Sequence, residues 1–143
     1  MKTVKITKAS ITIVLCLATI LCFIGCNQVD ATGIWENATY LSDKEFGKGA
    51  TTVQLEVKAG DQSVTFTVNT DKKMLGDALI EHKLIEGEES QFGLYVKKVN
   101  GIVADFNVDG TYWALYQNGE MLMTGVDTTQ ITNGAHYEFV RTK

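Results

Sequence analysis

The 143-residue chain contains no proline, and its three cysteines all lie before residue 27. The lack of proline excludes a rigid Pro-rich spacer. From residue 27 on the chain has no cysteine, so this part can form neither an internal disulfide nor a thiolate metal site. It must therefore be held together by the burial of apolar side chains, and its length suits a single domain.

Basic residues are also scarce once the N-terminal segment is set aside. Lys2, Lys5 and Lys8 stand near the start, and without them ten basic residues remain against 17 acidic ones, a net charge of −7. A protein that binds nucleic acid needs a basic face to neutralise phosphates. We therefore expect no nucleic-acid partner.

Residue types that perform catalysis are few. The chain has two histidines, His82 and His136, whereas a zinc site needs several ligands. The serines beyond residue 27 do not lie in a nucleophile elbow, and no glycine-rich phosphate loop follows a strand pattern. We predict that the protein is not an enzyme.

The first 25 residues have the pattern of a secretory signal. A short basic start is followed by an apolar run at residues 9–25, which is close to the lower length limit of a transmembrane helix. The run ends in FIGC at residues 23–26, which resembles the lipobox of bacterial lipoproteins. The resemblance implies cleavage before Cys26, a lipid anchor on that cysteine, and a location on the extracytoplasmic face of the bacterial cell membrane.

The rest of the chain divides into a tether and a domain. Residues 26–50, which begin with the lipidated cysteine, are polar and show little periodicity, so we predict a tether that packs in part as an edge strand. Residues 51–143 contain several short segments in which apolar and polar residues alternate, as in half-buried strands. The predicted division is therefore a signal peptide (1–25), a tether (26–50) and a domain (51–143).

The domain is predicted to be α+β. Apolar residues at helical spacing indicate one helix over residues 74–84, capped by Thr70 or Asp71, with an acidic turn following at 86–89. One helix is thus expected to cover an antiparallel or mixed sheet. The expected strands lie at residues 53–57, 64–68, 94–99, 112–117, 120–124 and 137–141, with Asn-Gly turns at 100–101, 118–119 and 133–134.

Four motifs of this domain resemble a known family. They are LGDAL at residues 75–79, VNGI at 99–102, TYWAL at 111–115 and TGVD at 124–127. They are similar to the C-terminal domain of transcobalamin and intrinsic factor, and more so to the bacterial lipoprotein domains of unknown function grouped with it. The resemblance covers about residues 52–142 and implies a small β-grasp-like domain that binds small molecules, with corrinoids as the ligands of the animal members.

The family also implies a partner. In the animal proteins a separate helical domain holds the other face of the cobalamin. For this chain, the resemblance implies that a second protein or a membrane transporter covers that other face of the ligand.

One predicted strand carries the aromatic residues that best suit a ligand. Tyr112, Trp113 and Tyr116 lie in this strand, and Met121 and Met123 follow across the hairpin. Flat rings with a polar tip suit stacking on a conjugated ring. Because alternate residues of a strand face opposite sides, Trp113 faces away from the two tyrosines, and ordinary core or cross-strand packing is the alternative.

A second candidate site is the motif DFNVDG at residues 105–110. Its spacing places Asp105, Asn107 and Asp109 around a tight turn, as at the start of a Ca²⁺ loop, and Asp127 is a further candidate ligand. Tyr116 stands where a standard loop has its closing acid, and the flanking segments are predicted strands. A purely structural turn is the alternative.

Three functions follow from these features. The leading hypothesis is a membrane-anchored extracytoplasmic module that captures a corrinoid or a similar planar cofactor for uptake by a transporter. The alternatives are a Ca²⁺-binding module built on residues 105–109 and a non-catalytic protein-interaction domain.

Overall fold

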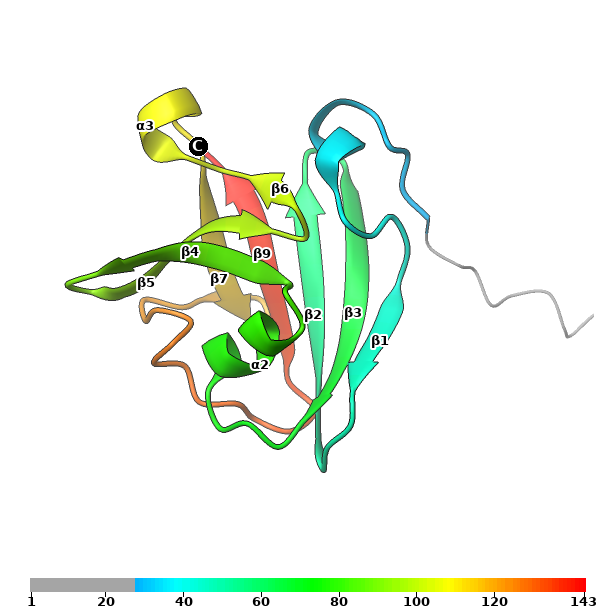
Figure 1. Ribbon diagram of the computed structural model, residues 1–143, viewed down its shortest axis with the longest axis vertical. Coiled ribbons are helices and arrows are strands. Elements are labelled where there is room, and N and C mark those ends of the chain that lie inside the picture. The colour runs from blue at the N-terminus through cyan, green and yellow to red at the C-terminus, as the bar shows by residue number, and fades with distance from the viewer. Residues whose placement is uncertain (1–27) are drawn as a thin grey trace, which may run out of the picture.

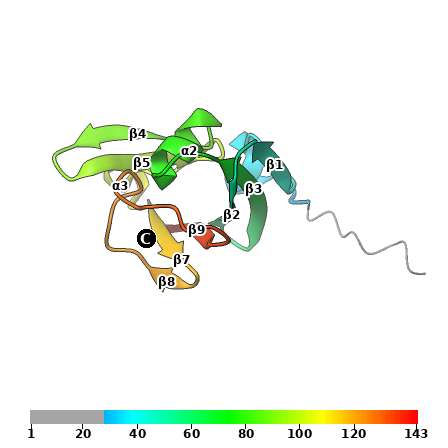
Figure 2. The same ribbon diagram turned by 90° about the horizontal axis from the view of Figure 1, so that it is seen from below.

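Residues 28–143 are described by the computed structural model of the chain, so the predicted signal peptide and Cys26 lie outside the described residues. The fold is α+β, as predicted: two sheets pack on each other, with a helix beside the smaller sheet (Figure 1). Seen from below, α2 and the smaller sheet form one layer, and the strands of the larger sheet curve beneath it (Figure 2).

The larger sheet is mixed, with the strand order β1-β3-β2-β9-β7-β8. The pairs β1–β3 and β2–β9 are parallel, and the other neighbours are antiparallel. Its strands are β1 (Lys44–Gly47), β2 (Thr51–Ala59), β3 (Gln62–Thr70), β7 (Tyr112–Gln117), β8 (Glu120–Met121) and β9 (His136–Thr142).

The smaller sheet is antiparallel, with the order β4-β5-β6. Its strands are β4 (Ile85–Ser90), β5 (Gly93–Val99) and β6 (Ile102–Val103). The helical elements are the 3-10 helix η1 (Gly33–Asn37), α2 (Leu75–Glu81) and the one-turn α3 (Phe106–Asp109). No helix in this part of the chain has the length and apolar character needed to cross a bilayer.

The core lies between the two sheets. From the third residue of β2 and of β3 onward, every second residue is buried, and Leu55 pairs directly with Phe66 across these strands. Tyr137 and Phe139 of β9 extend the same buried face. Polar residues occupy the alternate positions of β2 and β3, so the opposite face of these two strands is polar, as the alternation in the sequence requires.

The segment predicted as a tether packs on this core from residue 28 onward. Trp35 is 1% exposed, and its indole Nε1 donates to the Ala59 carbonyl at 2.8 Å. Val29 is also buried, and β1 forms a parallel edge strand on β3. These contacts make residues 28–47 part of the same folded unit as residues 51–143. Burial of the indole stabilises this packing, because it removes a large apolar surface from water.

The helix differs in detail from its prediction. α2 begins at Leu75, its N-cap residue is Met74, and no side chain caps it. The two predicted caps have other partners: Thr70 accepts a hydrogen bond from the Lys72 N–H, and Asp71 accepts one from the Ala50 N–H. The helix also ends earlier than predicted, at Glu81.

Two other segments differ from the predictions. The expected acidic turn at residues 86–89 is part of β4, because these residues pair with β5 across a bulge between Glu86 and Gly87. The strand expected at residues 120–124 ends at Met121, since β8 pairs with β7 at only two positions. The last residues of that expected strand instead form a loop beside β7.

Candidate functional site

An apolar pocket opens where β5, β7 and the segment after β8 meet. Its volume is about 420 Å³, which is in the range of small-molecule sites. Phe92 and Met123 at its rim are 85% and 92% exposed, which is unusual for side chains of this size. It is lined by Phe92, Leu94, Tyr95, Val96, Tyr112, Trp113, Ala114, Leu115, Met121, Leu122, Met123, Thr124, Gly125, Val126 and Phe139.

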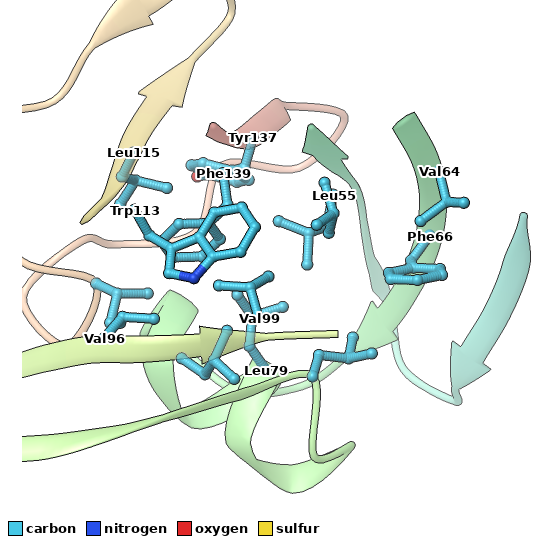
Figure 3. Packing of buried hydrophobic residues seen from close by; sticks show 14 of the residues in the cluster. Leu55, Val64, Phe66, Leu79, Val96, Val99, Trp113, Leu115, Tyr137 and Phe139 are labelled. Atoms are coloured by element: carbon cyan, nitrogen blue, oxygen red, sulfur yellow. The ribbon is translucent and has the colours of Figure 1, made fainter. Parts of the chain in front are cut away.

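Trp113 forms the inner wall of this pocket. Figure 3 shows its side chain directed from β7 into the space between the sheets, near Val96 and beside Phe139, with which it makes an edge-to-face contact. Its Nε1 is buried and has no hydrogen-bond partner among the described residues. A buried donor without a partner costs about 1–3 kcal/mol, so an acceptor on a bound molecule would recover stability here.

The backbone of β7 offers further polar groups at the same place. β8 pairs with β7 only at Tyr116 and Gln117, and the Leu122 N–H then donates to the Leu115 carbonyl at 2.8 Å. Backbone groups alternate between the two edges of a strand, so the N–H and C=O of Trp113 point to the same edge as that carbonyl. Within residues 28–143, no strand pairs with β7 at Trp113 on this side.

The structure divides the residues that the sequence indicated for ligand binding. Trp113, Met121 and Met123 line the pocket together, and Tyr112 also contributes to its lining. Tyr116 does not line it, since it lies on the polar face of the sheet, where it pairs with Glu138. The two tyrosines and the two methionines therefore do not form a single ligand-facing surface.

The predicted Ca²⁺ motif forms the one-turn helix α3 and the residues around it. Asp105 is the N-cap of α3: its carboxylate accepts the Asn107 N–H at 3.0 Å and pairs with Lys97 at 3.2 Å. Hydrogen bonds that Lys97 donates to Glu88 and Asp105 raise the pKa of Lys97. The Asn107 side chain is exposed.

Asp109 also has partners within the protein. It accepts hydrogen bonds from the Thr111 hydroxyl and N–H, and its Oδ2 lies 2.6 Å from Arg141 Nη2. The Thr111 hydrogen bond, together with the Arg141 charge, holds the pKa of Asp109 below its usual range. Both acids of the motif are therefore already neutralised by a basic side chain.

Asp127, the fourth predicted metal ligand, lies next to different residues. Its carboxylate is beside Gly93 and Gly125, where a Cβ on Gly93 would stand only 2.5 Å from Asp127 Oδ2. Gly93 has a φ of +99°, which favours glycine, and the absence of a Cβ also lets the Asp127 carboxylate approach its backbone closely. Asp127 Oδ1 is buried without a hydrogen-bond partner among the described residues.

A group that the sequence did not indicate lies on the polar face of the larger sheet. Glu56, His136 and Glu138 each offer a ligand atom, and these atoms lie within 4.8 Å of one another. His136 Nε2 is 3.0 Å from Glu56 Oε2, and Lys58 Nζ is 3.3 Å from the same oxygen and also bonds Glu138. Parallel pairing of β2 with β9 brings these residues together across 80 positions of sequence.

The charge state of this group follows from its contacts. Burial by itself would raise the pKa of Glu56, but hydrogen bonds from Ser63, His136 and Lys58 outweigh burial and lower it. The hydrogen bond that Lys58 donates to Glu138 raises the pKa of Lys58. Lys58 thus holds a positive charge between two carboxylates.

The other histidine, His82, is not part of this group. His82 follows the last residue of α2, and its ring packs on Phe46 with 5.6 Å between ring centroids. Its Nε2 is buried and has no partner among residues 28–143. The sequence favours a helix-surface residue over a ligand at this position, and the structure places His82 at the C-cap of α2, half-buried against Phe46.

Comparisons with known proteins bear on the fold. Residues 73–139 match the model of a domain of unknown function, DUF4430. No curated protein sequence matches the chain.

Two solved structures are similar to this one. One is a protein from Ruminococcus gnavus ATCC 29149, provisionally described as metal-binding; it has 29% identity and a TM-score of 0.62, over 65% of this chain and 97% of that chain. The other is haptocorrin in complex with Cbi, with 24% identity and a TM-score of 0.54, over 68% of this chain and 26% of that chain. The chain therefore spans about a quarter of haptocorrin and shares a transcobalamin-like fold with it.

Proposed function

We propose that the protein is a lipid-anchored binding module on the extracytoplasmic face of the cell membrane, and that its apolar pocket holds part of a small cofactor. The observation that carries the proposal is the pocket itself, with its exposed rim and with a buried Trp113 Nε1 that has no hydrogen-bond partner in the described part of the chain. Folding alone does not favour such a surface, because the exposed apolar side chains gain nothing from burial, and a buried donor without a partner among the described residues lowers stability.

The ligand that we favour is a corrinoid or a similar planar cofactor. Haptocorrin, which has a similar fold, was solved with Cbi bound. Aromatic and thioether side chains, as supplied here by Tyr95, Trp113 and Met123, suit a conjugated ring. The pocket is open to solvent, so we propose that a second protein, such as a membrane transporter, covers the exposed face of the ligand.

The lining also supports a role without catalysis. Tyrosine is the only titratable residue type among the fifteen residues that line the pocket. General acid-base chemistry near neutral pH usually needs His, Glu, Asp or Lys within hydrogen-bond distance of the substrate. We therefore propose capture and delivery rather than turnover.

Calorimetric titration of the full-length protein, purified in detergent, with cobinamide or cobalamin tests this proposal. Met123→Ala should weaken binding about tenfold, because one well-buried thioether contributes roughly 1.5 kcal/mol. Trp113→Phe should also weaken it, since the ring remains while the Nε1 donor is lost. Tyr116→Ala is the matched control, because Tyr116 lies on the same strand but outside the pocket.

The outcomes separate the hypotheses. A larger effect of Tyr116→Ala than of Met123→Ala would move the site to the polar face of the sheet. No heat at protein concentrations of tens of micromolar would contradict corrinoid capture by this chain alone and would favour the protein-interaction alternative.

Metal binding is the second candidate, and one observation favours a site different from the predicted Ca²⁺ turn. Glu56, His136 and Glu138 form a group of ligand atoms, whereas Asp105 and Asp109 are occupied by Lys97 and Arg141. One imidazole and two carboxylates suit Zn²⁺, with water completing the coordination. The similar Ruminococcus gnavus protein, provisionally described as metal-binding, adds support.

Lys58 makes this candidate testable, because its ammonium group already lies between the two carboxylates. Lys58→Met should tighten Zn²⁺ binding measured by calorimetry, since it removes the competing charge and keeps most of the side-chain volume. His136→Gln in the Lys58→Met background should remove the gain. Equal Zn²⁺ affinity in all these proteins would contradict a metal site here.

A further inference from the structure

Two methionines of the apolar pocket are also accessible to solvent. Met123 is 92% exposed and Met121 is 49% exposed, and both side chains line the pocket. Met121 is the last residue of β8, and Met123 lies in the loop that follows this strand. A thioether in such a position can be reached by small reagents in solution as well as by a ligand, and exposed thioethers are the ones that oxidants attack.

The rest of the described chain offers oxidants little other sulfur. Residues 28–143 contain no cysteine, so their sulfur atoms belong to Met74, Met121 and Met123. Met74 is the half-buried N-cap residue of α2, bridges to Gln130, and does not line the apolar pocket. Because oxidation follows exposure, Met123 should react before Met74.

A peroxide oxidises a thioether by transferring one oxygen atom to it. A lone pair of the Met123 sulfur attacks one oxygen of hydrogen peroxide, and the O–O bond breaks. The proton of the transferred hydroxyl group goes to the departing hydroxide, so the products are a sulfoxide and one water. The sulfur loses two electrons and the peroxide gains them, so the step needs no other reagent.

The sulfoxide changes the character of the pocket rim. A thioether is only a weak hydrogen-bond acceptor, whereas a sulfoxide is a polar group that water hydrates strongly. Phe92 and Leu94, which line the same pocket, are apolar. A planar ligand that packs on Met123 would have to remove the water from this oxygen, and burial of a polar group without a hydrogen bond costs free energy. Oxidation should therefore weaken ligand binding.

We propose that Met123 is a reversible oxidation site, with Met121 as a second and slower one, and that the Met123 sulfoxide makes the pocket release its ligand. This inference rests on the ligand of the proposed function and on its location outside the cytosol, where reducing systems are concentrated. Methionine sulfoxide reductases reverse the modification, one enzyme for each epimer, so reduction restores binding. The pocket would thus hold its ligand under reducing conditions and release it under peroxide stress.

The rates of oxidation test the modification site without any ligand. The full-length protein, purified in detergent, would be treated with limiting hydrogen peroxide and digested, and the mass of each methionine peptide followed with time. We expect Met123 to be oxidised about tenfold faster than Met74, with Met121 between them. Equal rates at Met123 and Met74 would overturn the proposal.

Calorimetric titration with cobinamide tests the release. After removal of the peroxide, the oxidised protein should bind about tenfold more weakly than the untreated protein, and treatment with both reductases should restore binding. Met123→Leu should lose little affinity on oxidation, when it is compared with its own untreated form. Met74→Leu is the matched control, because it is the same substitution outside the pocket and should lose as much affinity as the wild type.

The outcomes separate this inference from the proposed function. An unchanged affinity of the oxidised wild type, an equal loss in Met123→Leu, or a loss that the reductases do not reverse would overturn the release of ligand by oxidation. No binding of cobinamide by the untreated protein would instead contradict the proposed function, and with it the release. The oxidation rates would still decide whether Met123 is the modification site.

Discussion

Replacement of Trp35 tests the finding that the N-terminal segment belongs to the folded unit. Trp35 is almost fully buried, and its Nε1 donates to the Ala59 carbonyl at the end of β2. Trp35→Ala removes a large buried ring, which costs about 3–5 kcal/mol, and leaves that carbonyl without its partner. The expected loss is thus about 4–6 kcal/mol, a large part of the stability of a domain of this size.

Thermal unfolding followed by circular dichroism measures this effect. A loss of this size should lower the Tm by on the order of 15–20 °C. Trp35→Phe should fall between the wild type and Trp35→Ala, because it keeps most of the packing and loses the hydrogen bond. Ile34→Ala is the matched control: Ile34 is the preceding residue and is exposed, so its Tm should change little.

The same Tm measurements can contradict the packing of residues 28–47. If residues 28–47 were a loose tether, Trp35→Ala and Ile34→Ala would have the same small effect on the Tm. A Tm for Trp35→Ala within about 3 °C of the wild type would refute the packing argument, because this corresponds to less than about 1 kcal/mol.

Three further predictions concern other parts of the fold. Asn100→Ala should lower the free energy of unfolding, measured in urea, by on the order of 3 kcal/mol, because buried Asn100 bonds both the N–H and the carbonyl of Tyr40. Glu56→Gln should make the free energy of unfolding fall less steeply as the pH is lowered below neutral. The pKa of Glu56 is lowered from 4.5, so its contribution is complete above that value and is lost as the pH falls through the lower folded pKa. Gly87→Ala should speed amide hydrogen exchange in β4 and β5, because its Cβ would overlap the Tyr95 carbonyl oxygen; unchanged exchange would contradict this.

The sequence predicts those elements whose pattern is local. Alternation in residues 53–57 and 64–68 identifies the buried face of β2 and β3, because side chains of a strand alternate between faces. The Asn-Gly pairs at 100–101 and 118–119 identify turns for a different reason. All four of these residues have positive φ, which Asn and Gly adopt at the lowest cost.

Features that depend on distant pairing were not predictable. Gln54, Glu56 and Lys58 could be assigned to a polar face, but nothing local shows that β9 pairs with β2 in parallel. His136 therefore had no visible partner in the sequence, although Glu56 lies 3.0 Å away in the fold. The burial of Trp35 was predictable only in part: the apolar residues of its segment indicated some packing on the domain, but without periodicity they did not show which side chain enters the core.

The pocket was predictable in part. Trp113, Met121 and Met123 were indicated by their position around the Asn-Gly turn, and they line the pocket together. Phe92 and Tyr95 were missed, because their position depends on how the β4–β5 hairpin lies on the larger sheet. Asp127 was a candidate ligand for the Ca²⁺ motif because it was expected on the neighbouring turn, whereas the fold places its carboxylate beside Gly93 and Gly125.

The pocket exists because the two sheets cover each other incompletely at β7. β8 is too short to pair with Trp113, and the following loop passes the edge of β7 at Leu115, so the inner face of the strand opens to solvent beyond this point. A longer β8 would have closed this edge and paired with the Trp113 backbone, which no strand among residues 28–143 does on this side. The chain instead places exposed Phe92 and Met123 around a buried indole N–H that has no partner among residues 28–143, and this unpaired donor costs stability. A cost of this kind, concentrated at one site, is more readily explained by a ligand than by folding.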